Sequence, residues 1–179
     1  MRPNSDIHIM VVDDKRGSRE ALQKMIAKEG YQVSIAHDTE TALEIFGCEA
    51  AHLVITDLRM PGRDGISLLK EVKRMSSETE VILISGHGTV ETAVEAMREG
   101  AYDFITKPLE RVVVLKAISK AREKQDLTRE NADLRAQLRS LSDASGFIGN
   151  SAAVREVKEL IRQVAPTSAN VLILGESGT

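Results

Sequence analysis

The residues best suited to do chemistry are carboxylates, a hydroxyl and a lysine, each placed just after a short apolar run. These runs have the length and the β-branched content of buried strands. The residues that follow them are Asp13 and Asp14, Asp57, Ser85, and Lys107. Open α/β sheets bind their ligands at the carboxyl ends of their strands. We therefore expect these five side chains to share one pocket at that edge of a sheet.

The mixture of groups narrows the chemistry of this pocket. Carboxylates within several Å of one another repel, so the pocket must gain protons, a cation or both. A sparse set of oxygen ligands that leaves room for water and phosphate suits Mg²⁺ better than Ca²⁺. Lys107 adds a compact positive charge, and Ser85 adds a hydroxyl donor. These groups are what phosphoryl transfer to Asp57 requires, because positioned cations stabilise the charge on the transferred group.

Each residue also has an ordinary structural explanation. An aspartate after a strand can begin a turn or cap a helix, and serine is frequent in turns. A lysine is usually a solvated surface charge. The position of all five residues after strands favours a shared site over five unrelated accidents.

The elements that must position these residues alternate along the first two thirds of the chain. Apolar runs typical of strands lie at residues 7–12, 31–36, 52–56, 81–84 and 102–105, and a helical pattern follows each run. Five βα units in succession predict an α/β fold with a doubly wound, five-stranded parallel sheet. We expect the flavodoxin-like strand order 2-1-3-4-5, which makes the first and third strands neighbours.

Details of single elements follow from the same pattern. The second run alternates strictly between polar and apolar residues, which favours a place near the sheet edge. Asp38 and Thr89 are expected to cap helices, and Gly100 to end one. In the helix after Thr89, the apolar residues are expected to face inward; they are Val90, Ala93, Val94 and Met97.

Size and composition exclude several classes of protein. The chain has 179 residues, 42% of them hydrophobic and 28% charged, as in soluble globular proteins. Its net charge of −3 gives no basic field for nucleic acid or an anionic membrane. The single cysteine, Cys48, excludes an internal disulfide framework. No secretory leader and no apolar run of about 20 residues is visible, so we expect a cytoplasmic protein without a membrane partner.

A long helix is expected after the fifth strand, because residues 109–142 contain no glycine and no proline. From Leu127 the spacing is that of a heptad, with a and d positions at Leu127, Asn131, Leu134, Leu138 and Leu141. A single Asn at an a position favours a two-stranded coiled coil, so the pattern predicts a homodimer. Two heptads are fewer than the three or four that typically identify a coiled coil, so an ordinary amphipathic linker helix is the alternative.

The last residues, 143–179, have the pattern of a separate segment. A break at 142–146 precedes a helix that ends before Pro166, and residues 170–174 are typical of a strand. The strand runs into Gly175-Glu-Ser-Gly178-Thr179, which is how a phosphate-binding P-loop begins, although the Gly-Lys-Ser/Thr that would complete it is absent. This segment has too few strands to bury its apolar faces, so we expect it to be the first piece of a truncated domain.

Residues 7 to about 122 resemble the receiver domain of two-component response regulators. The resemblance rests on Asp13-Asp14, Asp57 with Met60-Pro61-Gly62 and Asp64-Gly65, Ser85-Gly86, and Phe104-Ile-Thr-Lys107-Pro108. It implies that Asp57 accepts a phosphoryl group from a sensor histidine kinase. It also implies that Mg²⁺ is held by Asp13, Asp14, Asp57 and the backbone carbonyl of Arg59. Ser85 and Lys107 would then contact the phosphoryl group, and the aromatic ring of Phe104 would reorient as a switch.

Three further stretches resemble NtrC-type activators, which join a receiver to an AAA+ ATPase that acts on sigma-54 RNA polymerase. They are Ser85-Gly-His-Gly-Thr89, residues 96–104, and Phe147-Ile-Gly149 with residues 175–179. The resemblance implies a receiver at 5–122, a helical dimerisation linker at 123–142, and the truncated start of an ATPase at 143–179. Gly175 and Gly178 would belong to its incomplete P-loop. ATP, sigma-54 RNA polymerase and DNA would bind only to the full-length parent, so this chain is expected to be a phosphoacceptor and not an enzyme.

Three other functions would explain parts of the pattern. A phosphatase with Asp57 as nucleophile would usually need a second acid two residues later, where this chain has Arg59. A nucleotide-binding Rossmann enzyme would need G-x-G-x-x-G after the first strand, and that motif is absent there. A pure dimerisation module would explain the heptads but not the acidic pocket.

Overall fold

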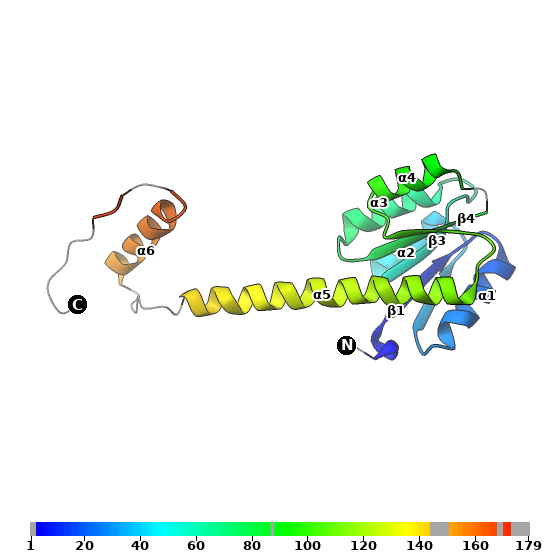
Figure 1. Ribbon diagram of the computed structural model, residues 1–179, viewed down its shortest axis with the longest axis horizontal. Coiled ribbons are helices and arrows are strands. Elements are labelled where there is room, and N and C mark those ends of the chain that lie inside the picture. The colour runs from blue at the N-terminus through cyan, green and yellow to red at the C-terminus, as the bar shows by residue number, and fades with distance from the viewer. Residues whose placement is uncertain (1–2, 87, 144–150, 168–169, 173–179) are drawn as a thin grey trace. The chain divides into compact units, whose positions relative to one another are not determined.

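The computed structural model describes residues 3–86, 88–143, 151–167 and 170–172. The chain divides into two units, Met1–Glu130 and Asn131–Thr179, which are described separately. The first unit holds a five-stranded parallel sheet whose strands are β1 (His8–Val12), β2 (Gln32–Ala36), β3 (Leu53–Asp57), β4 (Glu80–Ser85) and β5 (Asp103–Thr106). The strand order is β2-β1-β3-β4-β5, which confirms the predicted α/β fold (Figure 1).

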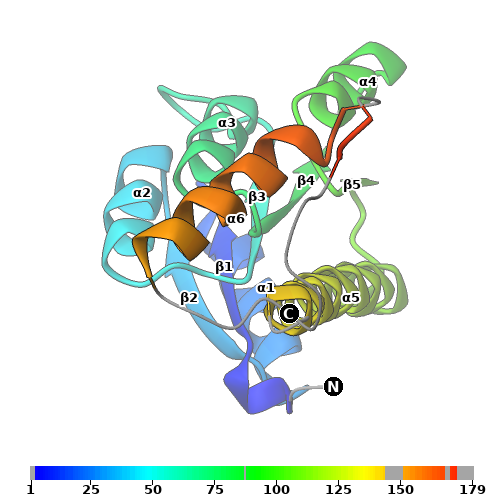
Figure 2. The same cartoon turned by 90° about the vertical axis from the view of Figure 1, so that its left-hand side faces the viewer.

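Helices cover both faces of this sheet. They are α1 (Arg16–Ala27), α2 (Thr39–Cys48), α3 (Gly65–Met75), α4 (Val90–Arg98) and α5 (Arg111–Asp143), with the short 3-10 helix η1 (Asn4–Asp6) before β1. One face packs against α2, α3 and α4, and the other against α1 and α5 (Figure 2). Burial on both faces explains the continuous apolar runs of β1, β3 and β4, all of whose residues are buried. The alternating β2 is a sheet edge and is partly exposed, as predicted.

Side-chain caps set the starts of several helices. The Asp38 carboxylate accepts the N–H of Thr41 at 2.8 Å, and Thr89 forms a capping box with Thr92. Gly100 follows α4 with φ +93°, a conformation that favours glycine. The predicted caps at Asp38 and Thr89 and the predicted stop at Gly100 are therefore confirmed.

The prediction that four apolar residues of α4 face inward is wrong for three of them, whereas the fourth, Ala93, is half-buried. Val90, Val94 and Met97 are 76%, 44% and 49% exposed, whereas Ala96 is fully buried. Helix α4 lies at the β4–β5 end of the sheet, so only a narrow stripe of it reaches the core. The small Ala96 side chain faces the core there, and the larger apolar side chains point away from it. Helical periodicity located the apolar face but not the side that meets the sheet.

In the second unit, α6 (Ala152–Val164) begins after Ser151, whose side chain accepts the N–H of Val154 at 3.3 Å. It ends before Pro166, as predicted. The strand predicted at 170–174 is not formed at residues 170–172, where Val171 and Leu172 are exposed. A strand needs a neighbour for its backbone hydrogen bonds, and no strand among the described residues pairs with residues 170–172. Residues 173 and 174, the P-loop glycines Gly175 and Gly178, and most of the predicted break at 142–146 lie outside the described residues.

Among the helices that the structure describes, none combines the length and the apolar composition needed to cross a membrane.

Candidate functional site

Three carboxylates meet at the carboxyl edge of the sheet. Strands β1 and β3 are neighbours, with Val12 opposite Thr56, so the residues that follow them are adjacent. Asp13, Asp14 and Asp57 each offer a carboxylate oxygen, and these oxygens lie within 4.8 Å of one another. Asp13 and Asp57 are buried, while Asp14 is exposed. The pocket is therefore anchored in the core and open to solvent on one side.

Lys107 links two of these carboxylates. Its Nζ donates to Oδ2 of Asp57 and lies 3.1 Å from Oδ2 of Asp13. Burial lowers the pKa of Lys107, but its hydrogen bonds to Asp57 and Asp13 outweigh this, so that pKa lies above its ordinary value. Lys107 is thus a cation at neutral pH and balances part of the negative charge of the pocket.

Ser85 and Phe104 lie beside this cluster. Ser85 is the buried last residue of β4, and its carbonyl accepts the backbone N–H of Lys107 at 2.8 Å. A Cβ atom built on Gly88 would lie 2.6 Å from Cζ of Phe104 and 3.2 Å from Cβ of Ser85. The half-buried Phe104 ring therefore packs directly against Gly88, next to Ser85. The predicted switch residue and the predicted hydroxyl contact share one small region.

The loop after β3 folds back onto the site. The N–H of Leu58 donates to the Ile84 carbonyl at 2.7 Å, and the N–H of Gly65 donates to the Leu58 carbonyl at 2.9 Å. The N–H of Arg59 donates to Oδ1 of Asp57 at 3.2 Å. The Asp57 carboxylate is therefore held on one oxygen by a backbone donor and on the other by Lys107. The metal-ligand role of the Arg59 carbonyl stays a prediction.

The donor set of the pocket fits Mg²⁺. It offers three carboxylates and no nitrogen or sulfur ligand among them, which suits a hard divalent cation. Asp14 is exposed, so the site leaves room for water and a phosphoryl oxygen beside such an ion. Residues Asp13, Asp14 and Asp57 could therefore hold the ion.

Comparison with known proteins decides the family. The sequence model of one protein family, the response regulator receiver domain, matches residues 9–119. The chain belongs to this family. Over nearly its whole length it is also homologous to part of the regulatory protein DctD and to part of NtrX. The family model itself covers the receiver only.

Three similar proteins illustrate the relationship of this receiver. The C4-dicarboxylate transport transcriptional regulatory protein DctD of Rhizobium meliloti is 33% identical over 171 residues, which are 96% of this chain and 37% of DctD. The crystal structure of NtrX from Brucella abortus has a TM-score of 0.69 and 38% identity, covering 89% of this chain and 35% of that one. The solution structure of the beryllofluoride-activated NtrC4 receiver domain dimer has a TM-score of 0.64 and 32% identity, covering 66% of this chain and 98% of that one. The chain thus spans less than two fifths of DctD and of NtrX.

The receiver pocket also contains a residue that sequence reasoning missed. Ser18, in the first turns of α1, donates its hydroxyl to Oδ2 of Asp13 at 2.7 Å. The N–H of Lys15 donates to the other oxygen, Oδ1, at 2.8 Å, and Arg19 donates to the Asp13 carbonyl at 2.6 Å. Ser18 therefore orients the same carboxylate oxygen that Lys107 contacts. The sequence offered one sign of this role, namely a serine at the start of the helix that follows the paired aspartates.

Replacing Ser18 by alanine is expected to weaken Mg²⁺ binding about 10-fold, because a ligand that loses its orienting partner typically loses 10–100-fold in affinity. Titration calorimetry with MgCl₂ measures this constant directly. Ser18→Thr keeps the hydroxyl and should bind Mg²⁺ like the wild type. Equal affinities for the alanine variant and the wild type would contradict the role of Ser18.

Proposed function

We propose that this chain is the phosphorylation-controlled receiver of a two-component system, in which Asp57 accepts a phosphoryl group from a sensor histidine kinase. The observation that carries the proposal is the charge arrangement around Asp57. Lys107 joins Asp57 to Asp13, and Asp14 lies within 4.8 Å of both carboxylates. This arrangement combines a nucleophile, a fixed cation and the ligands for a second cation at one solvent-open point.

The transfer step follows from these contacts. A carboxylate oxygen of Asp57 forms the new bond to phosphorus, and the bond from phosphorus to the donor's leaving atom breaks. Lys107 stays protonated and stabilises the charge on the transferred oxygens, and the buried Ser85 at the end of β4 would donate its hydroxyl to one of them. A Mg²⁺ ion held by Asp13, Asp14, Asp57 and the Arg59 carbonyl would neutralise further negative charge.

The response is a shift between two packings of the region around β4, β5 and α4. A phosphoryl group brings a charge of about −2 and new acceptor oxygens to Asp57. Lys107 and Ser85 would turn toward these oxygens, and the Phe104 ring would fill the space that they leave. Helix α4 has few buried residues, and its apolar side chains Val90, Val94 and Met97 are exposed, so it can repack at low cost.

The linker helix is proposed to carry the response to a second copy of the chain. Leu127, Leu134 and Leu138 are 59%, 52% and 65% exposed along α5. Apolar side chains at heptad positions that stay uncovered in one chain are the pattern of a coiled-coil seam. The side chain of Leu141 lies outside the described part of the chain. The related NtrC4 receiver was solved as a dimer, which supports a homodimer here.

Charges in the seam should separate the dimer. Leu134→Asp with Leu138→Asp is expected to raise the dimer dissociation constant by at least about 100-fold, because each chain loses two leucines that the dimer would bury. Sedimentation equilibrium gives this constant. Ala136→Asp, on the outer side of the heptad, is the matched control and should leave it nearly unchanged. An equal rise of the dissociation constant in the control, or no rise in the double leucine variant, would contradict the coiled-coil seam.

The remaining parts of the proposal concern a longer protein. By likeness to DctD and NtrX, residues 143–179 would begin an AAA+ ATPase, with ATP, sigma-54 RNA polymerase and DNA as partners of domains beyond this chain. The proposed boundaries at 5–122, 123–142 and 143–179 stay predictions; the division into two units falls after Glu130, inside the proposed linker. A cytoplasmic location is part of the same proposal.

Incubation with acetyl phosphate tests the proposal against its rival. The proposal predicts that one phosphoryl group is incorporated per chain in the presence of Mg²⁺ and almost none with a chelator. An aspartate-nucleophile phosphatase would instead turn over a phosphate ester continuously. Sustained turnover without a phosphorylated chain would reject the receiver function in favour of the phosphatase.

A further inference from the structure

The inner face of α5 changes character where the sheet ends. Its buried apolar residues are Val114, Ala117, Ile118 and Ala121, which pack against the sheet. The next positions on the same helical face are Lys124, Gln125 and Thr128. Apolar packing therefore gives way to polar contacts in the turns that lead into the linker.

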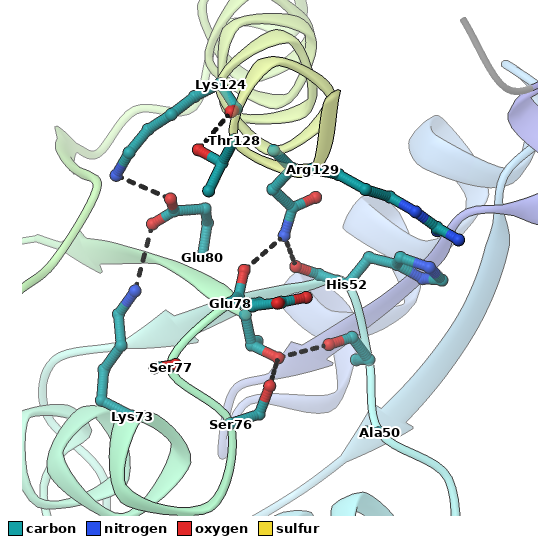
Figure 3. Close-up of a pocket in the computed structure, with 13 residues that line it drawn as sticks. Ala50, His52, Lys73, Ser76, Ser77, Glu78, Glu80, Lys124, Thr128 and Arg129 are labelled. Atoms are coloured by element: carbon teal, nitrogen blue, oxygen red, sulfur yellow. Dashed lines mark hydrogen bonds and ion pairs between the residues drawn. The ribbon is translucent and has the colours of Figure 1, made fainter. Parts of the chain in front are cut away.

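Glu80 is the centre of these polar contacts. It is the first residue of β4 and is only 5% exposed. Its Oε1 lies 2.6 Å from Nζ of Lys124 on α5, and its Oε2 lies 3.2 Å from Nζ of Lys73 on α3. Figure 3 shows the carboxylate between the two lysines. A buried carboxylate needs such partners, because an unpaired charge in the interior is costly.

Gln125 fastens the same turn of α5 to the residues that precede β3 and β4. Its Nε2 donates to the carbonyl of His52, just before β3, at 2.6 Å and to the carbonyl of Glu78 at 2.8 Å. Nζ of Lys124 also lies 5.3 Å from the centre of the Tyr102 ring, just before β5. One turn of the helix is thus tied to the amino ends of β3, β4 and β5.

The other ends of these strands form the phosphoacceptor site. Strand β3 begins at Leu53 and ends in Asp57, while β4 begins at Glu80 and ends in Ser85. The β5 strand contains Phe104 and leads into Lys107. A strand of five or six residues is about 17–20 Å long and stiff along its length. A displacement of β4 or β5 at the site therefore reaches the contacts of α5 directly.

We propose that Glu80, Lys124 and Gln125 form a polar lock that fixes the direction in which the linker helix leaves the receiver. Through this lock, movements of β4 and β5 reach the heptads from Leu127 onward. The three lock residues line a groove of about 500 Å³ together with Lys73, Thr128 and other residues, and this groove would give the helix room to change its tilt. The lock thus has a fixing role, which holds the direction of the helix, and a transmission role, which passes movements of the strands to the heptads. The transmission role rests on the proposed phosphorylation function, whereas the fixing role does not.

The test compares two double variants of the 179-residue chain. The lock variant is Lys124→Met with Gln125→Ala. The control is Lys120→Met with Glu123→Ala, which changes exposed side chains on the same helix. Thermal melting followed by circular dichroism shows whether the double variant folds. If it does not, Lys124→Met alone takes its place.

Hydrogen exchange tests the fixing role in the absence of any phosphodonor. The amides of residues 122–130 are expected to exchange at least about 10-fold faster in the lock variant than in the wild type and the control. Equal exchange in all three proteins would overturn the lock.

Beryllofluoride tests the transmission role. It should change the dimer dissociation constant of the wild type and the control by the same factor, and that of the lock variant by much less. In a separate reaction with acetyl phosphate, phosphoryl incorporation should agree within about twofold among the three proteins. An undiminished change in the lock variant would overturn transmission through the lock. If the wild type itself incorporated no phosphoryl group, the proposed function would fail, and the exchange experiment would still decide the fixing role.

Discussion

Asp57→Asn is expected to reduce incorporation of a phosphoryl group from acetyl phosphate by at least about 100-fold, because an amide is not a phosphoryl-accepting nucleophile. The variant should still fold. Asn keeps the shape of the side chain and one oxygen that can accept from Lys107, and Lys107 keeps its contact with Asp13. Intact-mass spectrometry after a fixed reaction time measures the modified fraction, and a thermal melt verifies the fold.

Asp14→Asn is the matched control for this experiment. It also removes one carboxylate from the pocket, but Asp14 is exposed and is proposed only as a metal ligand. It should raise the Mg²⁺ concentration needed for modification while Asp57 is still phosphorylated at saturating Mg²⁺. Loss of modification in the Asp14 variant together with full modification of the Asp57 variant would reverse the assigned roles.

Gly65→Ala is expected to destabilise the chain by roughly 3 kcal/mol or more, at the upper end of the range for overpacked sites. A Cβ atom at Gly65 would lie 2.4 Å from the backbone oxygen of Asp57 and 2.9 Å from Cδ2 of Leu83. The nearest of these atoms belongs to the backbone, which cannot rotate away as a side chain can. The substitution must therefore displace either the start of α3 or Asp57 itself.

Gly17→Ala is the control, because no atom lies within 4 Å of a Cβ built there and the residue lies within α1. It should stabilise the chain by about 0.5–1 kcal/mol through the helix propensity of alanine. Urea unfolding followed by circular dichroism gives both free energies. A Gly65 variant as stable as the wild type would show that the loop after β3 can relax without cost.

Much of the fold could be predicted because local signals and global packing agree. The apolar run before Asp57 is buried on both faces of the sheet, and the alternating run from Tyr31 to Ala36 is at its edge. The prediction for α4 failed because this helix covers the end of the sheet, where only Ala96 is fully buried. The strand predicted at 170–174 failed at residues 170–172 because β-propensity does not supply a pairing partner.

The convergence of Asp13, Asp57 and Lys107 was predictable for a topological reason, since parallel strands bring their carboxyl ends to one edge. Ser18 and Glu80 were not. Ser18 sits in a helix, and only the three-dimensional placement of α1 turns its hydroxyl toward Asp13. Glu80 precedes an apolar run and would be expected in water, but it is buried because lysines from two helices far apart in the sequence reach it. A pair such as Glu80 with Lys124, between elements far apart in the sequence, carries no local signal.

The most direct measurement of the central claim is the position of the phosphoryl group on the chain. Reduction of the phosphorylated protein with borohydride converts an aspartyl phosphate to homoserine, and peptide mass spectrometry then locates it. Homoserine is expected at position 57 alone when Mg²⁺ is present during phosphorylation, and at no position when the ion is chelated beforehand. Homoserine at another aspartate, or an unmodified residue 57 in a phosphorylated chain, would contradict the assignment of Asp57.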